Sequence, residues 1–158
     1  RRSDVGPQGF PVNRTAAAAG TTELAADPSY RLEVRGVGEP TFLTLEQLRS
    51  MPQHSAELPI ACVEGWSASA NWTGVRVADV LRVAGVGEGT ITVRSAQRSG
   101  LYASSELSAG AAADDTCLLA LQLDGEDLHP DHGAPLRLIA PNRPGVLQTK
   151  WVTSLEVR

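Results

Sequence analysis

The sequence predicts an α+β domain, or a mainly β domain, built from mixed β-sheets with short helices. Segments with strand-like patterns outnumber helical ones, and the two kinds do not alternate regularly as they would in a parallel α/β fold. The 15 glycines and 10 prolines among 158 residues indicate many turns and few long helices. This length suits one domain with its own hydrophobic core.

Strands are predicted wherever apolar residues alternate with polar ones or form a short unbroken run. Leu32 and Val34 alternate with charged neighbours, which is the period of a half-buried strand. A later run ends at the turn signal Asp124-Gly125. The predicted strands cover residues 30–35, 58–62, 89–95, 116–123, 134–140 and 150–157.

Two short helices are predicted between these strands. Thr44 begins a capping box with Gln47 three positions later, so a helix should start there and end near Ser50. Over residues 77–84 apolar side chains recur on one helical face, and Gly85 follows as a C-cap.

Residues 1–29 lack clean periodicity and contain three prolines and an alanine-rich run. We interpret them as an extended strap with one irregular loop, lying against a domain formed by residues 30–158, with one domain overall. A disordered tail fits the composition equally well.

Charge and apolar patterning exclude some classes of function. Eighteen acidic residues against fourteen Lys and Arg give a net charge of -4, whereas general nucleic-acid binders are basic, so no nucleic-acid partner is expected. No stretch approaches the ~18 apolar residues of a membrane-spanning helix, and no signal peptide is visible. The chain begins at Arg1, so we expect a piece of a longer protein whose other part could carry an anchor or a partner domain.

The two cysteines, Cys62 and Cys117, form neither a metal-finger spacing nor a disulfide scaffold. Cys117 lies in an apolar run and is expected to be buried. Cys62 ends a strand-like run and enters a turn-prone segment, so its thiol should face a site built by loops. Such a thiol can be a nucleophile or a metal ligand, with a small buried hydrophobe as the alternative.

Functional residue types gather in three segments that we expect to be loops, namely 10–15, 62–74 and 131–151. Basic side chains in them would suit an anionic ligand, because Arg and Lys form charge-assisted bonds to phosphate or carboxylate. Solvated surface charges are the alternative, although Arg137 stands in an apolar strand and requires a partner or a route to solvent. These side chains are Arg14, His132, Arg137, Arg143 and Lys150.

No nucleophile elbow, phosphate-binding loop or zinc-protease motif occurs in the sequence. Two further interpretations remain. Cys62 and His132 could form the catalytic pair of a metal-free thiol enzyme, and Glu64 could be a general acid–base. Nothing in their spacing favours either.

Four motifs, in this order, resemble the molybdopterin-binding domain of the sulfite oxidase family over about residues 5–158. The resemblance implies the sulfite-oxidase-like fold and a molybdopterin-dependent oxidoreductase. The motifs are Ala61-Cys62-Val63-Glu64-Gly65-Trp66-Ser67, then Trp72-Thr73-Gly74-Val75, then His132-Gly133-Ala134-Pro135-Leu136-Arg137-Leu138-Ile139-Ala140-Pro141, and Gly145 with Lys150-Trp151.

The resemblance also implies residue roles. Cys62 would be the protein ligand of molybdenum, since a soft thiolate suits a metal already held by the pterin sulfurs. Tyr102 lies where the family often has an active-site tyrosine, so Cys62 and Tyr102 are the expected catalytic residues. The expected molybdopterin-binding residues are Val12, Asn13, Arg14, Ser95, His132, Arg137, Gly145 and Lys150.

The implied chemistry is oxygen-atom transfer on a small-molecule substrate of sulfoxide or sulfite type. Electrons would pass to or from a separate haem protein or membrane redox subunit. Sulfite oxidases carry arginines just after the cysteine, whereas Glu64, Gly65 and Trp66 stand here. The sequence is thus more similar to the bacterial branch that includes the protein-methionine-sulfoxide reductase catalytic subunit, and an extracytoplasmic or membrane-associated location is expected. A vestigial, non-catalytic binding domain is the alternative.

Overall fold

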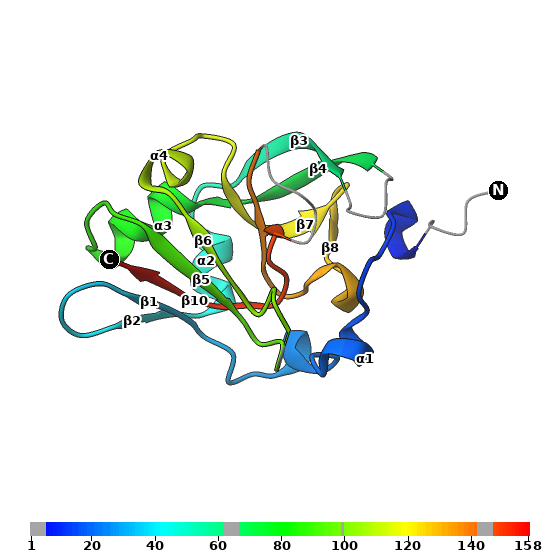
Figure 1. Ribbon diagram of the computed structural model, residues 1–158, viewed down its shortest axis with the longest axis horizontal. Helices are drawn as coiled ribbons and strands as arrows, with labels where there is room; N and C mark the ends of the chain where they lie inside the picture. Colours follow the sequence, from blue (N-terminus) through cyan, green and yellow to red (C-terminus); the bar gives the residue numbers. More distant parts are fainter. Residues whose placement is uncertain (1–5, 62–66, 99, 142–146) are drawn as a thin grey trace.

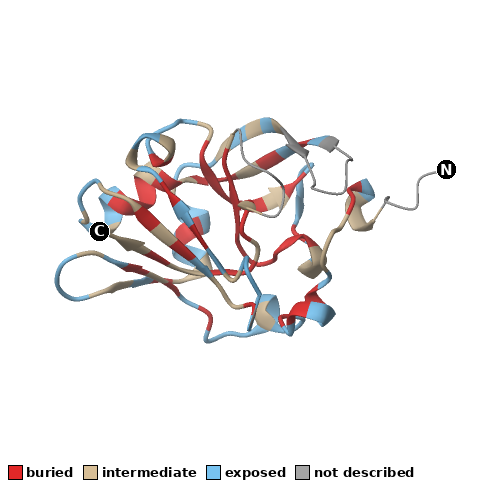
Figure 2. Ribbon diagram, in the orientation of Figure 1, coloured by how far each residue is buried: buried red, intermediate tan, exposed pale blue. Residues whose placement is uncertain are grey.

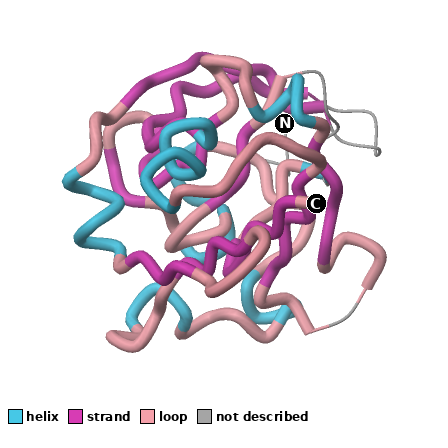
Figure 3. The backbone as a smooth tube through the Cα atoms, turned by 90° about the vertical axis from the view of Figure 1, so that its left-hand side faces the viewer, coloured by secondary structure: helices cyan, strands magenta, loops and turns pink. Residues whose placement is uncertain are grey.

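The computed structural model describes residues 6–61, 67–98, 100–141 and 147–158. Their strands form two sheets connected by loops, with helices present only as short segments (Figures 1 and 3). The predicted α+β class with mixed sheets and short helices is confirmed.

The first sheet is mixed and has the strand order β2-β1-β10-β5-β6. The last strand of the chain, β10, lies in the middle, parallel to β1 and antiparallel to β5 (Figure 1). The C-terminal strand therefore joins β1, from the early part of the sequence, to β5, from its middle. The bounds are β1 Leu32–Arg35, β2 Thr41–Leu43, β5 Ile91–Ser95, β6 Ser104–Leu107 and β10 Val152–Val157.

The second sheet is antiparallel and has the order β3-β4-β7-β8, with β9 also paired to β7. β7 is its central strand and is apolar on both faces, which is why it reads as a continuous hydrophobic run. The bounds are β3 His54–Ala61, β4 Ser67–Arg76, β7 Leu118–Leu123, β8 Glu126–Asp127 and β9 Arg137–Ile139.

The helices are short, and each begins or ends at a local signal. Thr44 and Gln47 form both hydrogen bonds of the capping box at the start of α2, and Gly85 adopts the left-handed conformation that ends α3. None of the helices in the described residues has the length and apolar character needed to cross a membrane. The helices are α1 Ala16–Ala19, α2 Leu45–Ser50, α3 Val77–Ala84 and α4 Ala109–Ala112, with 3-10 turns η1 Pro7–Gly9, η2 Leu24–Ala26 and η3 Pro130–His132.

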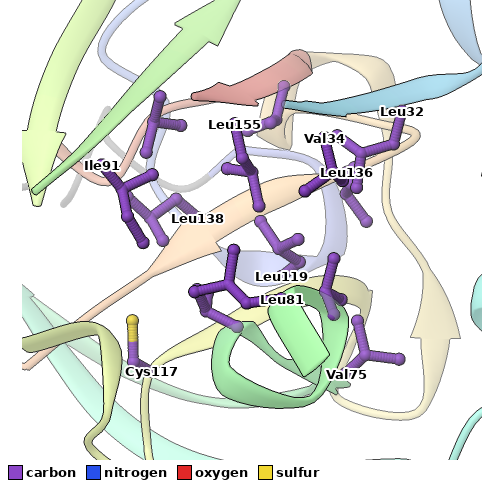
Figure 4. Packing of buried hydrophobic residues seen from close by; sticks show 14 of the residues in the cluster. Leu32, Val34, Val75, Leu81, Ile91, Cys117, Leu119, Leu136, Leu138 and Leu155 are labelled. Carbon is purple, nitrogen blue, oxygen red and sulfur yellow. The ribbon is translucent and has the colours of Figure 1, made fainter. Parts of the chain in front are cut away.

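The main hydrophobic core joins side chains of both sheets with α2 and α3 (Figure 4). Leu119 of β7 and Leu138 of β9 point into it together with Leu155 of β10, and all three are fully buried. Cys117 belongs to the same core and is buried, as expected (Figure 4). Buried residues recur along the strands of both sheets (Figure 2). Burying these apolar surfaces stabilises the fold by about 25 cal/mol per Å².

A second core covers the opposite face of β7 and draws in the N-terminal segment, residues 6–29. Phe10 packs edge-on against Trp72 of β4, with their ring centroids 5.3 Å apart. A third, small cluster places Ala16 and Ala19 of α1 against Trp151. The N-terminal segment thus packs through two apolar clusters, and this brings it beside the residues before β10.

The structure agrees with the predicted secondary structure where the signals are local. All six predicted strands and both helices are found, with ends displaced by a few residues as is usual for strand and helix boundaries. The strands β2 and β6, which are only three and four residues long, had not been predicted.

One prediction is wrong in part: the segment 62–74 was expected to be a loop, but Ser67–Arg76 forms the strand β4. Its sequence is rich in small polar residues, and β4 is held by pairing with β3 on one side and β7 on the other. Gly74 lies where the register with β7 shifts, and a Cβ at this position would lie 2.0 Å from the main-chain oxygen of Leu119. Gly74 thus permits the close approach of β4 to β7.

Candidate active site

Several segments far apart in sequence meet around Lys150. The described residues that line the resulting cavity come from the N-terminal segment, from the β5–β6 connection and from the stretch before β10. They are Asn13, Arg14, Gln97, Tyr102, Gln148, Lys150 and Trp151.

Lys150 is a cation that lines this cavity. Its Nζ donates to the main-chain oxygen of Arg14 at 2.5 Å and to that of Asp131 at 2.8 Å, and it lies 4.8 Å from the ring centroid of Trp151. Burial lowers the pKa of Lys150 to about 7, the positive charges of Arg137 and Arg14 lower it further, and the Asp131 carboxylate opposes them. An anion that entered the cavity would favour the charged ammonium.

Ser95, at the end of β5, orients Lys150 through the backbone. Its Oγ donates to the main-chain oxygen of Lys150 at 2.7 Å and accepts from the main-chain N–H of Gln97 at 3.0 Å. The hydroxyl expected to contact the cofactor therefore holds two wall residues of the cavity in place.

Arg137, on β9, is almost fully buried, with 4% of its surface exposed. Its Nε donates to the main-chain oxygen of Gln148 at 3.1 Å, one terminal nitrogen donates to that of His132 at 3.4 Å, and the guanidinium lies 5.1 Å from the Trp72 ring centroid. Burial lowers its pKa to about 9, so it is charged at neutral pH. These contacts supply the partners that its place in an apolar strand requires.

His132 is neutral and has a defined tautomer. Its Nε2 lies 2.6 Å from the main-chain oxygen of Pro7; because a carbonyl only accepts, Nε2 carries the hydrogen. Burial lowers its pKa to about 4, against the effect of this hydrogen bond and with help from the charges of Arg137 and Lys150. Nδ1 is therefore a bare acceptor.

The late motifs pack against each other backbone to backbone. Trp151 has φ 56°; its main-chain N–H donates to the oxygen of Gly133 at 3.2 Å, and its indole nitrogen donates to that of Pro130 at 2.7 Å. A Cβ on Gly133 would lie 2.8 Å from Cβ of Lys150, and Gly133 itself has φ 107°. A glycine after His132 is thus required for Lys150 to reach the cavity.

Gln148 braces the other side of the cavity. Its side-chain amide pairs with the backbone of Ala140 in both directions, donating to its oxygen at 2.6 Å and accepting from its N–H at 2.5 Å. Residues 140 and 148 are thereby fixed side by side.

One lining residue of the cavity has a buried polar atom without a hydrogen-bond partner, Arg14 Nε. His132 Nδ1, Trp72 Nε1 and His54 Nε2 are also buried without a partner, but their residues are not among the described lining residues. Such atoms are rare in folded proteins. With Lys150, Arg14 suits an anionic group such as a phosphate.

The structure brings many, but not all, of the predicted site residues together. Asn13, Arg14, Tyr102 and Lys150 line one cavity, with Tyr102 39% exposed at its edge. Ser95, His132 and Arg137 hold its walls, whereas Val12 is half-buried and does not appear among the described lining residues. The predicted residues Cys62, Gly145 and Arg143, and also Glu64, lie outside the described residues.

Sequence reasoning missed Gln97, Gln148 and Trp151 as lining residues and Trp72 as the ring beneath Arg137. Gln97 could have been found by the signal that selected Ser95, a polar side chain after a middle strand. Gln148 and Trp72 carry no such signal, because their roles depend on segments distant in sequence.

Larger hollows exist elsewhere on the surface, including one of about 380 Å³ between α3 and α4. Its lining consists mainly of alanine, glycine and aliphatic residues, with one arginine and one glutamate. Residue chemistry rather than size therefore selects the small cavity at Lys150 as the candidate site.

Comparison with known proteins identifies the family of the chain. Residues 19–158 match the model of the oxidoreductase molybdopterin binding domain family. The chain is 34% identical over 153 residues to an uncharacterized oxidoreductase, YuiH, of Bacillus subtilis, covering 93% of this chain and 73% of that protein. It is 32% identical to a putative protein-methionine-sulfoxide reductase subunit, YedZ1, of Azospira oryzae, covering 94% of this chain and 56% of that one.

Two further similarities extend the comparison. A mitochondrial sulfite oxidase of Drosophila melanogaster is 30% identical over 156 residues, and the match covers 27% of its length. Among solved structures, the sulfane dehydrogenase SoxCD of Paracoccus pantotrophus shares the fold, with a TM-score of 0.76 and 22% identity over 99% of this chain and 44% of that one. The expected sulfite-oxidase-like fold is confirmed.

Proposed function

The chain belongs to the oxidoreductase molybdopterin binding domain family, and on this basis we propose that it holds a molybdenum–molybdopterin cofactor at the Lys150 cavity and catalyses oxygen-atom transfer. One observation carries the proposal: the partly buried cation Lys150 lines one cavity with Arg14, whose Nε is buried without a partner among the described residues. Without a ligand, such an arrangement is unfavourable.

In this proposal the residues divide into those that touch the cofactor and those that position them. Arg14 and Lys150 would bind the anionic end, and Asn13 lines the same cavity. His132, which is not among the described lining residues, would accept a hydrogen bond from the pterin through Nδ1. Arg137 and Ser95 fix the segments that carry Gln148 and Lys150. Residues 12–14 would form a cofactor-binding loop. They belong to the N-terminal strap, residues 1–29, which forms a single domain with residues 30–158.

When bound, the cofactor supplies the two-electron chemistry of oxygen-atom transfer. Cys62 would hold the molybdenum through its thiolate. Tyr102, at the edge of the cavity, would donate a hydrogen bond to the substrate oxygen, a role consistent with its partial exposure.

For the substrate we propose a sulfoxide-type compound. The support is the 32% identity to a putative protein-methionine-sulfoxide reductase subunit, together with Glu64, Gly65 and Trp66 in place of arginines after Cys62. Electrons would pass through a separate haem or membrane subunit, with the protein located outside the cytoplasm or at a membrane. The chain spans 56% of the YedZ1 relative and 27% of the fly sulfite oxidase, so those proteins contain further parts.

The test is to measure molybdenum by mass spectrometry and pterin by fluorescence after expression in a host that makes the cofactor. The wild type should contain about one of each per chain, Cys62→Ala should lose molybdenum while keeping its fold, and Cys117→Ala, which removes the core thiol, should keep it. Wild-type protein with neither molybdenum nor pterin would favour the vestigial binding domain. The ligand assignment would be contradicted if Cys117→Ala held pterin without molybdenum while Cys62→Ala held both.

A further inference from the structure

Asp131, in the middle of η3, joins the N-terminal segment to the wall of the cavity. Its Oδ1 accepts the main-chain N–H of Ala16, the first residue of α1, at 2.8 Å. Its main-chain oxygen accepts from Lys150 Nζ at 2.8 Å. One residue thus contacts α1 with its side chain and Lys150 with its backbone.

These contacts belong to a chain of hydrogen bonds that also includes Arg14, a cavity-lining residue. Lys150 Nζ also donates to the main-chain oxygen of Arg14, two residues before Ala16. Arg14 is therefore held from two sides, by Lys150 directly and by Asp131 through Ala16. Since Ala16 is only 1% exposed, loss of the Asp131 carboxylate would leave its N–H buried without a partner.

Other contacts around η3 hold the segment near Pro7 through the main chain of His129 and the ring of His132, and Asp131 Oδ2 also lies 3.9 Å from His129 Nδ1. The main-chain N–H of Asp131 donates to His129 Nδ1 at 3.0 Å, and that of His129 donates to Gln8 Oε1 at 2.9 Å. His132 holds Pro7 through Nε2. The bonds to Gln8 and Pro7 do not use the Asp131 carboxylate, so its removal should affect mainly α1 and Arg14.

The charge of Asp131 acts in the same direction as its geometry. Its carboxylate raises the pKa of Lys150, against the burial and the positive charges of Arg137 and Arg14 that lower it. Asp131 therefore favours the charged ammonium in the cavity.

We propose that Asp131 is a positioning residue of the cavity, which holds Arg14 and Lys150 in register by linking α1 to η3. The identity of the ligand rests on the proposed function, but the link is a property of the chain itself. Asp131 would act through Arg14 and Lys150 without touching the cofactor.

The first test is hydrogen exchange of the cofactor-free chain, followed by mass spectrometry. Asp131→Ala should speed exchange at residues 16–20 about tenfold, the factor that corresponds to ~1.4 kcal/mol, while peptides around Phe10 stay as in the wild type. Asp131→Asn, whose amide oxygen can still accept from Ala16, should exchange nearly as the wild type. Glu126→Ala removes an exposed carboxylate of β8 and is the control. Wild-type exchange at residues 16–20 in Asp131→Ala would overturn the proposal.

The second test is cofactor retention after expression in a cofactor-producing host. Asp131→Ala should lose pterin about tenfold faster than the wild type, and Asp131→Asn should restore most of the retention. Faster exchange with unchanged retention would refute the positioning role and leave the proposed function standing. Wild-type protein that never takes up pterin would refute the proposed function, and the exchange result would still decide the link.

Discussion

Lys150 donates a hydrogen bond from Nζ to the main-chain oxygen of Arg14, 136 positions earlier in the chain, at 2.5 Å. This contact joins the N-terminal segment to the residues before β10 and places two cationic side chains on one cavity. Two of the five predictions below concern Lys150 itself.

Lys150→Met should weaken cofactor retention about tenfold, because an anionic group loses a charge-assisted partner. Lys150→Arg keeps the charge and should retain more cofactor than Lys150→Met. Pterin fluorescence in protein after dialysis measures the difference. Equal retention in Lys150→Met and the wild type would exclude Lys150 as a cofactor ligand.

The pH dependence of Lys150 should have opposite signs with and without the cofactor. Its folded-state pKa of about 7 lies below the ordinary value of 10.5, so between these values the unfolded chain binds more protons and the cofactor-free fold becomes more stable as pH rises. The slope should reach up to about 1.4 kcal/mol per pH unit between pH 8 and 9. Cofactor retention should instead fall as pH rises above 7, since the ammonium loses its charge.

Urea unfolding and dialysis at pH 6 to 9 measure the two trends, and Lys150→Met should flatten both. Parallel rather than opposite trends would contradict this account of Lys150.

His132 should destabilise the fold in mild acid. Its folded-state pKa of about 4 lies below the ordinary 6.5, so the stability present above pH 6.5 is lost as pH falls towards 4, by up to about 3 kcal/mol. The comparison of wild type with His132→Asn removes the contribution of the carboxylates common to both. If the two proteins lose stability in parallel over this range, the ring does not stay neutral as the structure indicates.

Arg137→Met should destabilise the protein by about 2–4 kcal/mol, because the oxygens of Gln148 and His132 lose a buried charged donor. Cofactor loading should fall with it, since these carbonyls belong to the cavity wall. Arg137→Lys keeps the charge but not the fork of donors and should lie between the two. Denaturant unfolding and pterin content are the measurements, and an unchanged free energy of unfolding in Arg137→Met would show that the buried guanidinium is dispensable.

Gly133→Ala should destabilise the fold by about 2 kcal/mol or more and reduce loading, because its φ of 107° and the 2.8 Å approach to Lys150 exclude a Cβ. Gly110→Ala is the matched control, since a Cβ at Gly110 in α4 meets nothing within 4 Å. Thermal unfolding should separate the two variants, with the control equal to the wild type or slightly more stable. Similar melting temperatures for both would refute the requirement for glycine at 133.

Much of the secondary structure could be predicted from the sequence, because its signals are local. The capping box of Thr44 and Gln47 and the C-cap at Gly85 depend on residues within one or two helical turns. The alternation at Leu32 and Val34 depends on the fixed period of a strand. β4 was missed because its neighbours β3 and β7, rather than its own composition, keep it extended.

The sequence by itself determined the α+β class, the capped helices, the family resemblance and the residue types of an anion-binding site. Only the tertiary structure decided that Arg14, Asp131 and Lys150 meet, that Ser95 orients a backbone, and that Arg137 spans two loops over Trp72. It also decided that burial lowers the pKa of His132 to about 4 and that of Lys150 to about 7. The physical reason is that caps and periodicity act over a few residues, whereas desolvation and hydrogen bonding at the site depend on segments that only the folded chain brings together.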